Sequence, residues 1–443
     1  MHLITLNDPD LLIGLWHGTL KPFGSDKPRN WEWRTLIGDA WEAHGKAVTL
    51  CAKYIPSSFG RTPRNPAEKI NSGYKAWEFL IWIFWLGPVL LRHILPHQYW
   101  QNYCRFVQGC RIFNQYQITR NQLQHGHRLL LDFIDEFEDL YYQRQPERIH
   151  FVRQSIHLLS HLSSETVRLG PPAYYAQWTM ETLIGNLGKE VRQPGNPFSN
   201  ISERGVLRTQ MNVVHAMFPD LELIEPQKPP KNSLYVGEGY RLLRAKDKVI
   251  RHVTEVEGKA IMEYWNTQGW PNSEAWPRAV RRWARLQLPN GQIARSKWGE
   301  ERSRRKLRCT RMVKVRGLEE YAKFAEIYYY FELTFEPEIP GSFFLAVGSI
   351  FSSTESDQIL RNNSMANINC YQYQGDADLM VFPVQSILSV VAMVPFFTVT
   401  AESIIQPKNK FFLVEKPGLE LSIHLETLEN DEEYNDGDTD EGE

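Results

Sequence analysis

The sequence predicts an α+β protein with a mainly helical first half, a β-rich second half and an acidic tail. From Ala67 to about Leu187, apolar residues recur every three or four positions, which is typical of amphipathic helices. In the second half, EIYYYFELTF, SFFLAVGSIF, DLMVFPVQSILSVVAMV and KFFLVEK are rich in aromatic and β-branched residues, which favour strands. The last residues, 428–443, contain nine acidic side chains and no Lys or Arg. We expect this tail to be disordered, because it cannot bury enough apolar surface to offset its chain entropy.

Three signals place individual elements within the helical half. The apolar run FLIWIFWLGPVLL at 79–91 is too short to span a membrane, since a spanning helix needs about 20 residues. Its Gly-Pro break predicts a buried pair of helices instead. Thr119 is expected to cap the helix that contains QLQHGHRLLLDFIDEFEDLYYQ, because its hydroxyl stands just before the apolar repeat. After the break RQPGNPFSN, a further helix is expected at about 203–217.

Composition and charge favour a polyanion-binding protein from a reducing compartment. The net charge is −2, but without residues 429–443 the chain has 50 basic and 43 acidic residues, close to +7. The 14 Trp, 19 Tyr and 22 Phe residues suit large aromatic cores or, alternatively, stacking surfaces for bases. The five cysteines are scattered, without CxxC spacing, so neither zinc nor a disulfide framework is predicted. The start MHLITLNDPD lacks the basic region of a signal peptide.

A strip of basic residues from 278 to 316 is the predicted nucleic-acid contact, since Lys and Arg neutralise phosphates and interleaved tryptophans can stack on bases. A solvated basic face, or a strip held against the acidic tail, is the alternative interpretation. The strip also contains SRRKLR, a weak nuclear-import motif that predicts a nuclear location. Its predicted contact residues are Arg278, Arg281, Arg282, Arg285, Arg295, Lys297, Arg302, Arg304, Arg305, Lys306, Arg308, Arg311, Lys314 and Arg316, with Trp276, Trp283 and Trp298 for stacking.

Histidines give no metal prediction. His150, His157 and His161 are spaced to lie on one helix face, but no HExxH pattern accompanies them. We therefore expect them to be satisfied histidines of the core. No Walker loop, GxGxxG or GxSxG motif is present, so nucleotide-dependent and acyl-transfer chemistries are not predicted.

Several collinear motifs carry a resemblance to a known family. They are NPAEKINSGYKAWEF, LPHQYWQNYCRFVQGCRI, RIHFVRQSIHLLSHL, GPPAYYAQWTMETLIGNLGKEVRQPGNP and NISERG, followed by LPNGQIARSKW and FFLVEKPGL. On these motifs the chain resembles the C-terminal part of CACTA-type (En/Spm) DNA transposases, in their fungal-like branch. Its start, MHLITLNDPDLLIGLW, is similar to the segment that follows an Asp-x-Met-His signature in those enzymes.

The resemblance implies an RNase H-like nuclease in which three carboxylates hold two Mg²⁺ ions. In that family the first two acids precede the Met-His signature, whereas this sequence begins at Met1-His2. We therefore expect no DNA cleavage by this chain and no cofactor, with Mg²⁺ only where a complete site exists. Glu181 is the expected third acid; a glutamate favoured at a helix start by the dipole is the alternative. His2 is expected to be structural beside that site.

Together, patterns and resemblance predict the organisation and the role of the chain. The expected function is that of a transposase-derived, DNA-binding protein that is inactive alone and self-associates, with no membrane or small-molecule partner. The alternative is a non-catalytic scaffold module that binds an acidic partner. The expected parts are a remnant of an RNase H-like core at 1–65, a helical transposase-like domain at 66–224, a linker at 225–232, a β-rich accessory domain at 233–427 and the tail at 428–443.

Overall fold

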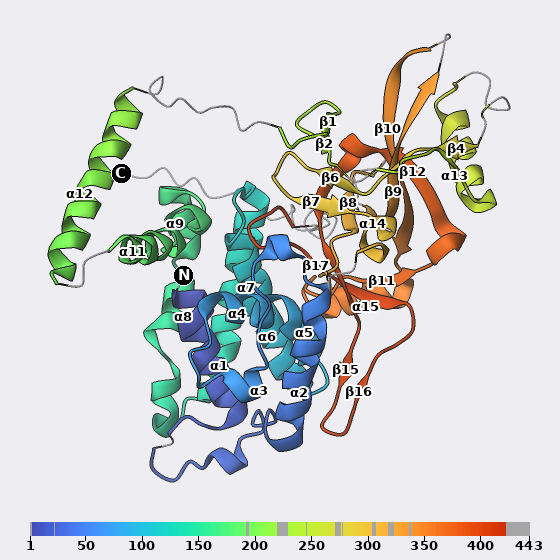
Figure 1. Cartoon of the computed structure of the whole chain (residues 1–443). Helices are drawn as coiled ribbons and strands as arrows, with labels where there is room; N and C mark the ends of the chain where they lie inside the picture. Colours follow the sequence, from blue (N-terminus) through green and yellow to red (C-terminus); the bar gives the residue numbers. More distant parts are fainter. Residues whose placement is uncertain are drawn as a thin grey trace, which may run out of the picture.

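The computed structural model confirms the mixed architecture, with helices in the first half and mostly strands in the second (Figure 1). The predicted tail and residues 225–228 of the predicted linker lie outside the residues that the structure describes. The described residues are 2–21, 23–191, 195–218, 229–244, 246–270, 276, 278–303, 307–317, 323–335 and 339–421.

Helices and short helical turns make up the first half. Its described residues contain no strand, so they lend no support to an RNase H-like core within 1–65. The predicted helix at 203–217 is confirmed and starts earlier, with Pro197 at its first position. The helices are α1 (Asp8–His17), α2 (Gly38–Cys51), α3 (Pro66–Lys69), α4 (Ala76–Ile81), α5 (Gly87–Leu90), α6 (His97–Phe113), α7 (Arg120–Phe137), α8 (Gln154–Leu159), α9 (Leu162–Leu169), α10 (Pro172–Tyr175), α11 (Trp178–Glu190) and α12 (Pro197–Met217).

The apolar run at 79–91 is buried, as predicted, but it forms one continuous helix rather than a pair. A π-helical segment, Trp82–Leu86, joins α4 to α5 without a break. Pro88 has no N–H to offer the Phe84 carbonyl four residues earlier. Arg111 Nε donates to that carbonyl instead, at 2.6 Å. The side chain of a neighbouring helix thus satisfies the group that the proline leaves open.

The predicted cap of the next long helix is also confirmed. The Thr119 hydroxyl accepts a hydrogen bond from the backbone N–H of Gln122 at 3.2 Å, and the Gln122 side chain accepts one from the backbone N–H of Thr119 at 3.0 Å. This reciprocal pair is a capping box at the start of α7.

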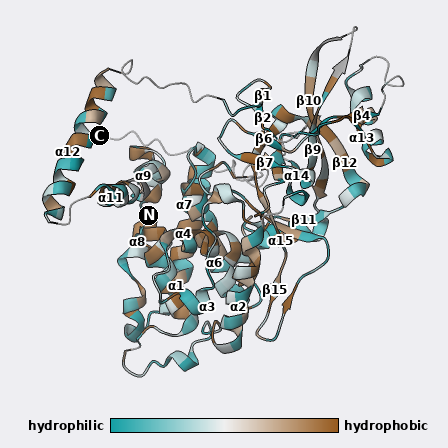
Figure 2. Ribbon diagram, in the orientation of Figure 1, coloured by the Kyte–Doolittle hydropathy of each residue, from teal (hydrophilic) through white to brown (hydrophobic). Residues whose placement is uncertain are grey.

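The second half is built from antiparallel sheets and, among its described residues, three α-helices (Figure 2). A four-stranded sheet has the order β1-β2-β6-β7, and a larger sheet has the order β13-β8-β9-β10-β11-β17-β14, with β5 and β12 paired to β9 and β10. The elements are β1 (Leu234–Tyr235), β2 (Arg241–Leu242), β3 (Arg251–His252), α13 (Glu255–Thr267), β4 (Ala279–Val280), β5 (Arg282–Trp283), β6 (Arg285–Gln287), β7 (Ile293–Arg295), α14 (Lys297–Glu301), β8 (Met312–Val315), β9 (Lys323–Phe335), β10 (Ile339–Ser352), α15 (Glu355–Asn363), β11 (Cys370–Tyr373), β12 (Leu379–Pro383), β13 (Ile387–Val390), β14 (Ala392–Pro395), β15 (Thr398–Val399), β16 (Ile404–Ile405) and β17 (Lys410–Val414).

The two halves share their largest hydrophobic core. Helical residues such as Phe106 cluster in it with Phe412 and other residues of the segment 360–421. Two hydrogen bonds also connect α6 to the segment 360–421. Arg111 Nη1 donates to the Asn367 carbonyl at 3.1 Å, and Asn367 Nδ2 donates to the Cys104 carbonyl at 2.6 Å. The last strands therefore pack as part of the helical half, although the predicted linker separates them in the sequence.

Candidate nucleic-acid interface

The four-stranded sheet has one buried face and one open face. Leu242, Leu286 and Ala294 stand opposite one another in register and are fully buried in a core beneath the sheet. Because successive side chains of a strand point to opposite faces, the neighbours of these residues point outward. The outward side chains are therefore fixed by the strand register.

Two rows of side chains occupy the outer face. In one row, Tyr235 pairs with Arg241, and Arg241 pairs with Gln287. Tyr235 is 56% exposed, and the guanidinium of Arg241 lies 5.4 Å from the centre of its ring. In the second row, Arg285 of β6 stands directly opposite Arg295 of β7. We call Tyr235, Arg241, Arg285 and Arg295 the basic sheet face.

The opposition of Arg285 and Arg295 is the most informative feature of this face. Like charges at directly opposed positions of an antiparallel pair destabilise a sheet. Both side chains are half-buried, so solvent screens them only in part. The Arg285 side chain donates one hydrogen bond, from Nη2 to the Arg244 carbonyl at 2.7 Å, which fixes its position without neutralising it. A bound anion would relieve this repulsion.

An open groove of about 660 Å³ runs beside the basic sheet face. Lys246 and Arg244 bring further positive charge to it, and Lys246 Nζ lies 4.9 Å from the centre of the Trp283 ring. The segment 241–251, RLLRAKDKVIR, was not predicted as part of the site, although it has five basic residues and one acid. The groove is lined by Asn232, Ser233, Leu234, Arg244, Lys246, Trp283 and Glu332.

Other residues of the predicted strip form ion pairs inside the protein. Arg282 Nε lies 2.8 Å from Asp247, and Arg311 lies 2.6 Å from Glu300 and 2.5 Å from Glu326. These carboxylates are almost fully buried. Arg282 and Arg311 are therefore structural cations rather than free contacts for phosphate. Lys314, which pairs with Glu415 at 3.2 Å, belongs with them.

The remaining strip residues have varied surroundings. Arg308 Nη1 donates to the Gly60 carbonyl at 2.7 Å, across the joint with the helical half. Lys297 Nζ lies 4.4 Å from the centre of the Tyr328 ring. Arg304, Arg305 and Lys306 lie outside the described residues. Among the described residues of the strip, the exposed cations are Arg278, Arg281, Arg302 and Arg316.

The predicted stacking tryptophans need correction. Trp283 is only 4% exposed and belongs to the core beneath the sheet, so no base can stack on it in this fold. Trp298 is partly buried, with the guanidinium groups of Arg282 and Arg302 over its ring at 5.0 and 5.2 Å. Trp276 is also partly buried and packs against the core around α13. Tyr235, which the sequence interpretation missed, is the exposed aromatic residue of the basic sheet face.

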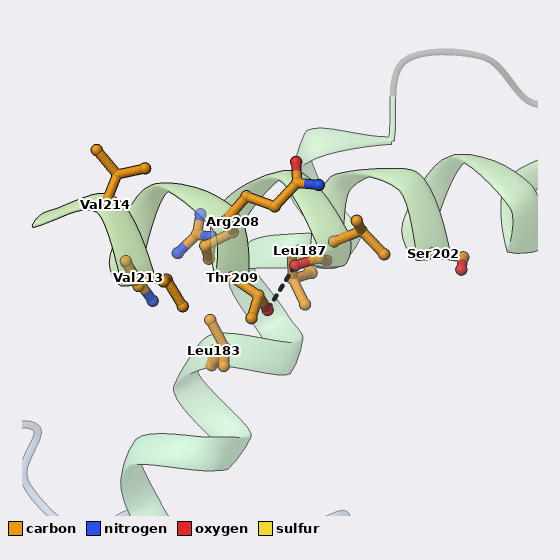
Figure 3. Close-up of a pocket in the computed structure, with 11 residues that line it drawn as sticks. Leu183, Leu187, Ser202, Arg208, Thr209, Val213 and Val214 are labelled. Carbon is orange, nitrogen blue, oxygen red and sulfur yellow. Dashed lines mark hydrogen bonds between the residues drawn. The ribbon is translucent and has the colours of Figure 1, made fainter. Parts of the chain in front are cut away.

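Glu181 lies on the first turn of α11, with its side chain 53% exposed. His2 Nε2 lies 3.5 Å from Glu181 Oε1, which brings together two residues that the family resemblance relates to one site. The described residues contain no group of three or more His, Cys, Asp or Glu side chains that could hold a metal ion. Leu183 and Leu187 of this helix line a groove against α12 (Figure 3).

The prediction of satisfied core histidines is wrong: His157 and His161 are not in the core, and neither ring nitrogen of His150 has a hydrogen-bond partner among the described residues. His157 and His161 are exposed, and their Nε2 atoms lie 3.1 Å apart. His157 lies in α8 and His161 directly precedes α9, and both rings reach solvent. His150 is half-buried, and its ring packs edge-on against Phe23 and Phe151.

Comparison with known proteins yields no relative: no protein-family model matches the chain, and neither a curated protein nor a solved structure does. Among the described residues, no helix is both long and apolar enough to cross a membrane. The basic sheet face is therefore interpreted from its own geometry.

Proposed function

We propose that this chain is a transposase-derived, DNA-binding protein of the nucleus, and that the basic sheet face is its contact with the nucleic acid. The observation that carries the proposal is the direct opposition of Arg285 and Arg295 across β6 and β7. Each guanidinium carries one positive charge and a fork of N–H donors, which match the single negative charge and the two free oxygens of a phosphodiester. Phosphate contacts of this kind supply most of the sequence-independent affinity for DNA.

Tyr235 supplies the second half of the recognition chemistry. Its exposed ring stands at the edge of the face, where Arg241 lies against it. An aromatic ring next to cations can stack on a base while the cations hold the backbone. The groove with Arg244 and Lys246 extends the positive surface beyond the sheet.

The contact between His2 and Glu181 supports the transposase relation, because both residues lie in segments that resemble motifs of that family. It does not supply a metal site. Two Mg²⁺ ions need several carboxylates in one cluster, and the described residues have no such group. The chain is therefore proposed to bind DNA without cleaving it, and no catalytic step is assigned to Glu181.

A charge-reversal pair tests the proposed function directly. The double variant Arg285→Glu/Arg295→Glu should weaken binding to a fluorescein-labelled 20-base-pair duplex by more than tenfold at fixed salt, measured by anisotropy. Two glutamates opposite each other repel as the two arginines do, so circular dichroism should confirm that the double variant still folds. Arg29→Glu/Arg144→Glu is the charge-matched control, since both arginines are exposed residues of the helical half. Equal affinity of the double variant and the control would refute the basic sheet face as the contact.

A further inference from the structure

One row of side chains on the outer face of the four-stranded sheet is not explained by phosphate binding alone. β1, β2, β6 and β7 lie side by side (Figure 1), and their register aligns four outward side chains across them, Tyr235, Arg241, Gln287 and Ile293. The two ends of the row are exposed, Tyr235 at 56% and Ile293 at 41%. Phosphates offer these apolar groups no favourable contact, whereas the flat faces of bases do. We call these four residues the tyrosine row.

The ring of Tyr235 is held in place while it remains exposed. Its hydroxyl accepts a hydrogen bond from the backbone N–H of Gly239 at 3.2 Å, just before β2 begins. The Arg241 guanidinium lies 5.4 Å from the ring centre and donates from Nη1 to the Ser233 hydroxyl at 3.3 Å. A side chain that is already ordered loses little conformational freedom when a base stacks on it. The ring is therefore preorganised for an aromatic partner.

The width of the sheet decides which form of nucleic acid can bring its bases to this row. The row crosses four strands, which at about 4.8 Å between neighbours makes it roughly 14 Å wide. The major groove of B-DNA is about 12 Å wide and admits a helix or a two-stranded ribbon. A four-stranded sheet cannot enter that groove, so in a duplex the tyrosine row would meet only phosphates and sugars. Unpaired bases can turn outward and stack on the sheet.

The groove beside the sheet fits the same partner. Besides the cations Arg244 and Lys246, it is lined by the Glu332 carboxylate and the Asn232 amide. A carboxylate repels phosphate, but it accepts hydrogen bonds from the amino group of a base such as cytosine. These edges are free when a base is unpaired. A groove for phosphates alone would have no use for Glu332.

The two opposed arginines lie within reach of the backbone of the same strand. Arg285 lies two residues along β6 from Gln287 of the tyrosine row, which corresponds to about 7 Å on the same face. A phosphate is one sugar away from its base, so a strand with bases on the row can place phosphates against Arg285 and Arg295. We infer that this face binds single-stranded nucleic acid in preference to duplex, with bases on the tyrosine row. The inference rests on the proposed function and specifies its substrate.

Anisotropy titrations with one 20-nucleotide sequence, as a single strand and as a duplex, test this preference. At fixed salt, the wild type should bind the single strand at least tenfold more tightly. Tyr235→Ala/Ile293→Ser should weaken single-strand binding on the order of tenfold and duplex binding much less, so the preference is lost. Tyr174→Ala/Ile405→Ser is the matched control, because both residues are exposed and lie outside the four-stranded sheet. It should keep the wild-type preference.

The outcomes separate this inference from the proposed function. Equal or tighter binding of the duplex by the wild type would overturn the single-strand preference and leave DNA binding intact. A wild-type protein that binds neither form would refute both. A double variant that retains the full preference would show that the bases do not lie on the tyrosine row.

Photo-cross-linking locates the bases independently. A single strand that carries 5-iodouracil forms covalent adducts with aromatic side chains that stack on this base. Mass spectrometry should find the adduct on Tyr235, in the tryptic peptide 232–241. Tyr240 of the same peptide is only 6% exposed and should stay unmodified, which provides an internal control. Adducts confined to other peptides would exclude base stacking on Tyr235.

Discussion

Two helices of this protein are rich in apolar residues and have opposite surroundings. Most of α6 is buried, including Arg111 and Asn102, whereas no residue of α12 is. The difference lies in what covers them: the segment 360–421 packs against α6 and buries it, whereas the described chain leaves every residue of α12 at least partly exposed. Apolar content alone thus does not say whether a helix is buried in a core.

The largest expected effect comes from disrupting the contact between α6 and the segment 360–421. Arg111→Ala removes the donors to the Phe84 and Asn367 carbonyls and the guanidinium that lies 4.1 Å from the centre of the Trp85 ring. Orphaned buried carbonyls and a new cavity should lower the free energy of unfolding by about 3–5 kcal/mol. Urea denaturation measures this loss. Arg204→Ala on the exposed α12 is the control and should change the free energy by less than about 0.5 kcal/mol.

Asp8, in the helical half, should make the stability of the protein depend on pH. Burial raises its pKa to about 7, and the nearby Ser155 hydroxyl and Arg153 offset this only in part. The folded state therefore binds the proton more tightly than the unfolded state, so this group costs stability as pH rises from about 4 to 7. Asp8→Asn should stabilise the protein at pH 8 by roughly 2–4 kcal/mol and have little effect at pH 4. Thermal melts of both proteins at the two pH values check this, and a gain that is equal at both would contradict it.

Substitution of Tyr235, which lies on the open surface, should affect DNA binding and leave stability nearly unchanged. Because its ring is exposed, Tyr235→Ala should leave the melting temperature nearly unchanged. Loss of base stacking should weaken DNA binding by about 1–3 kcal/mol. Tyr235→Phe keeps the ring and should bind almost as well as the wild type. A phenylalanine variant as weak as the alanine variant would assign the effect to the hydroxyl instead of stacking.

The acidic tail should give the smallest effect. Removal of residues 429–443 deletes nine negative charges, which under the proposed function would compete with DNA for the basic surface. Affinity for non-specific duplex should rise a few-fold at low salt, by anisotropy titration. An unchanged or lower affinity would rule out self-masking by the tail.

The sequence predicted local structure better than spatial neighbours. The Thr119 cap and the burial of the run at 79–91 follow from interactions within a few residues, so both were predictable. The continuity across Pro88 was not, because it depends on Arg111, which donates from another helix. Trp283 was wrongly predicted to stack on bases for a similar reason. Its position among basic residues in the sequence does not reveal the hydrophobic core in which it is buried. The pairing of 241–247 with 282–287 likewise depends on strand register, which brings Arg241 and Tyr235 to the site.

The most direct test of the account is the salt dependence of DNA binding by the wild-type chain and Arg285→Ala. A protein that contacts several phosphates should lose on the order of a thousandfold in affinity between about 50 and 200 mM salt. Loss of one such contact should reduce the slope of log affinity against log salt by about 1. We expect both results. Affinity that does not change with salt, or an identical slope for Arg285→Ala, would contradict the basic sheet face as a phosphate-binding surface.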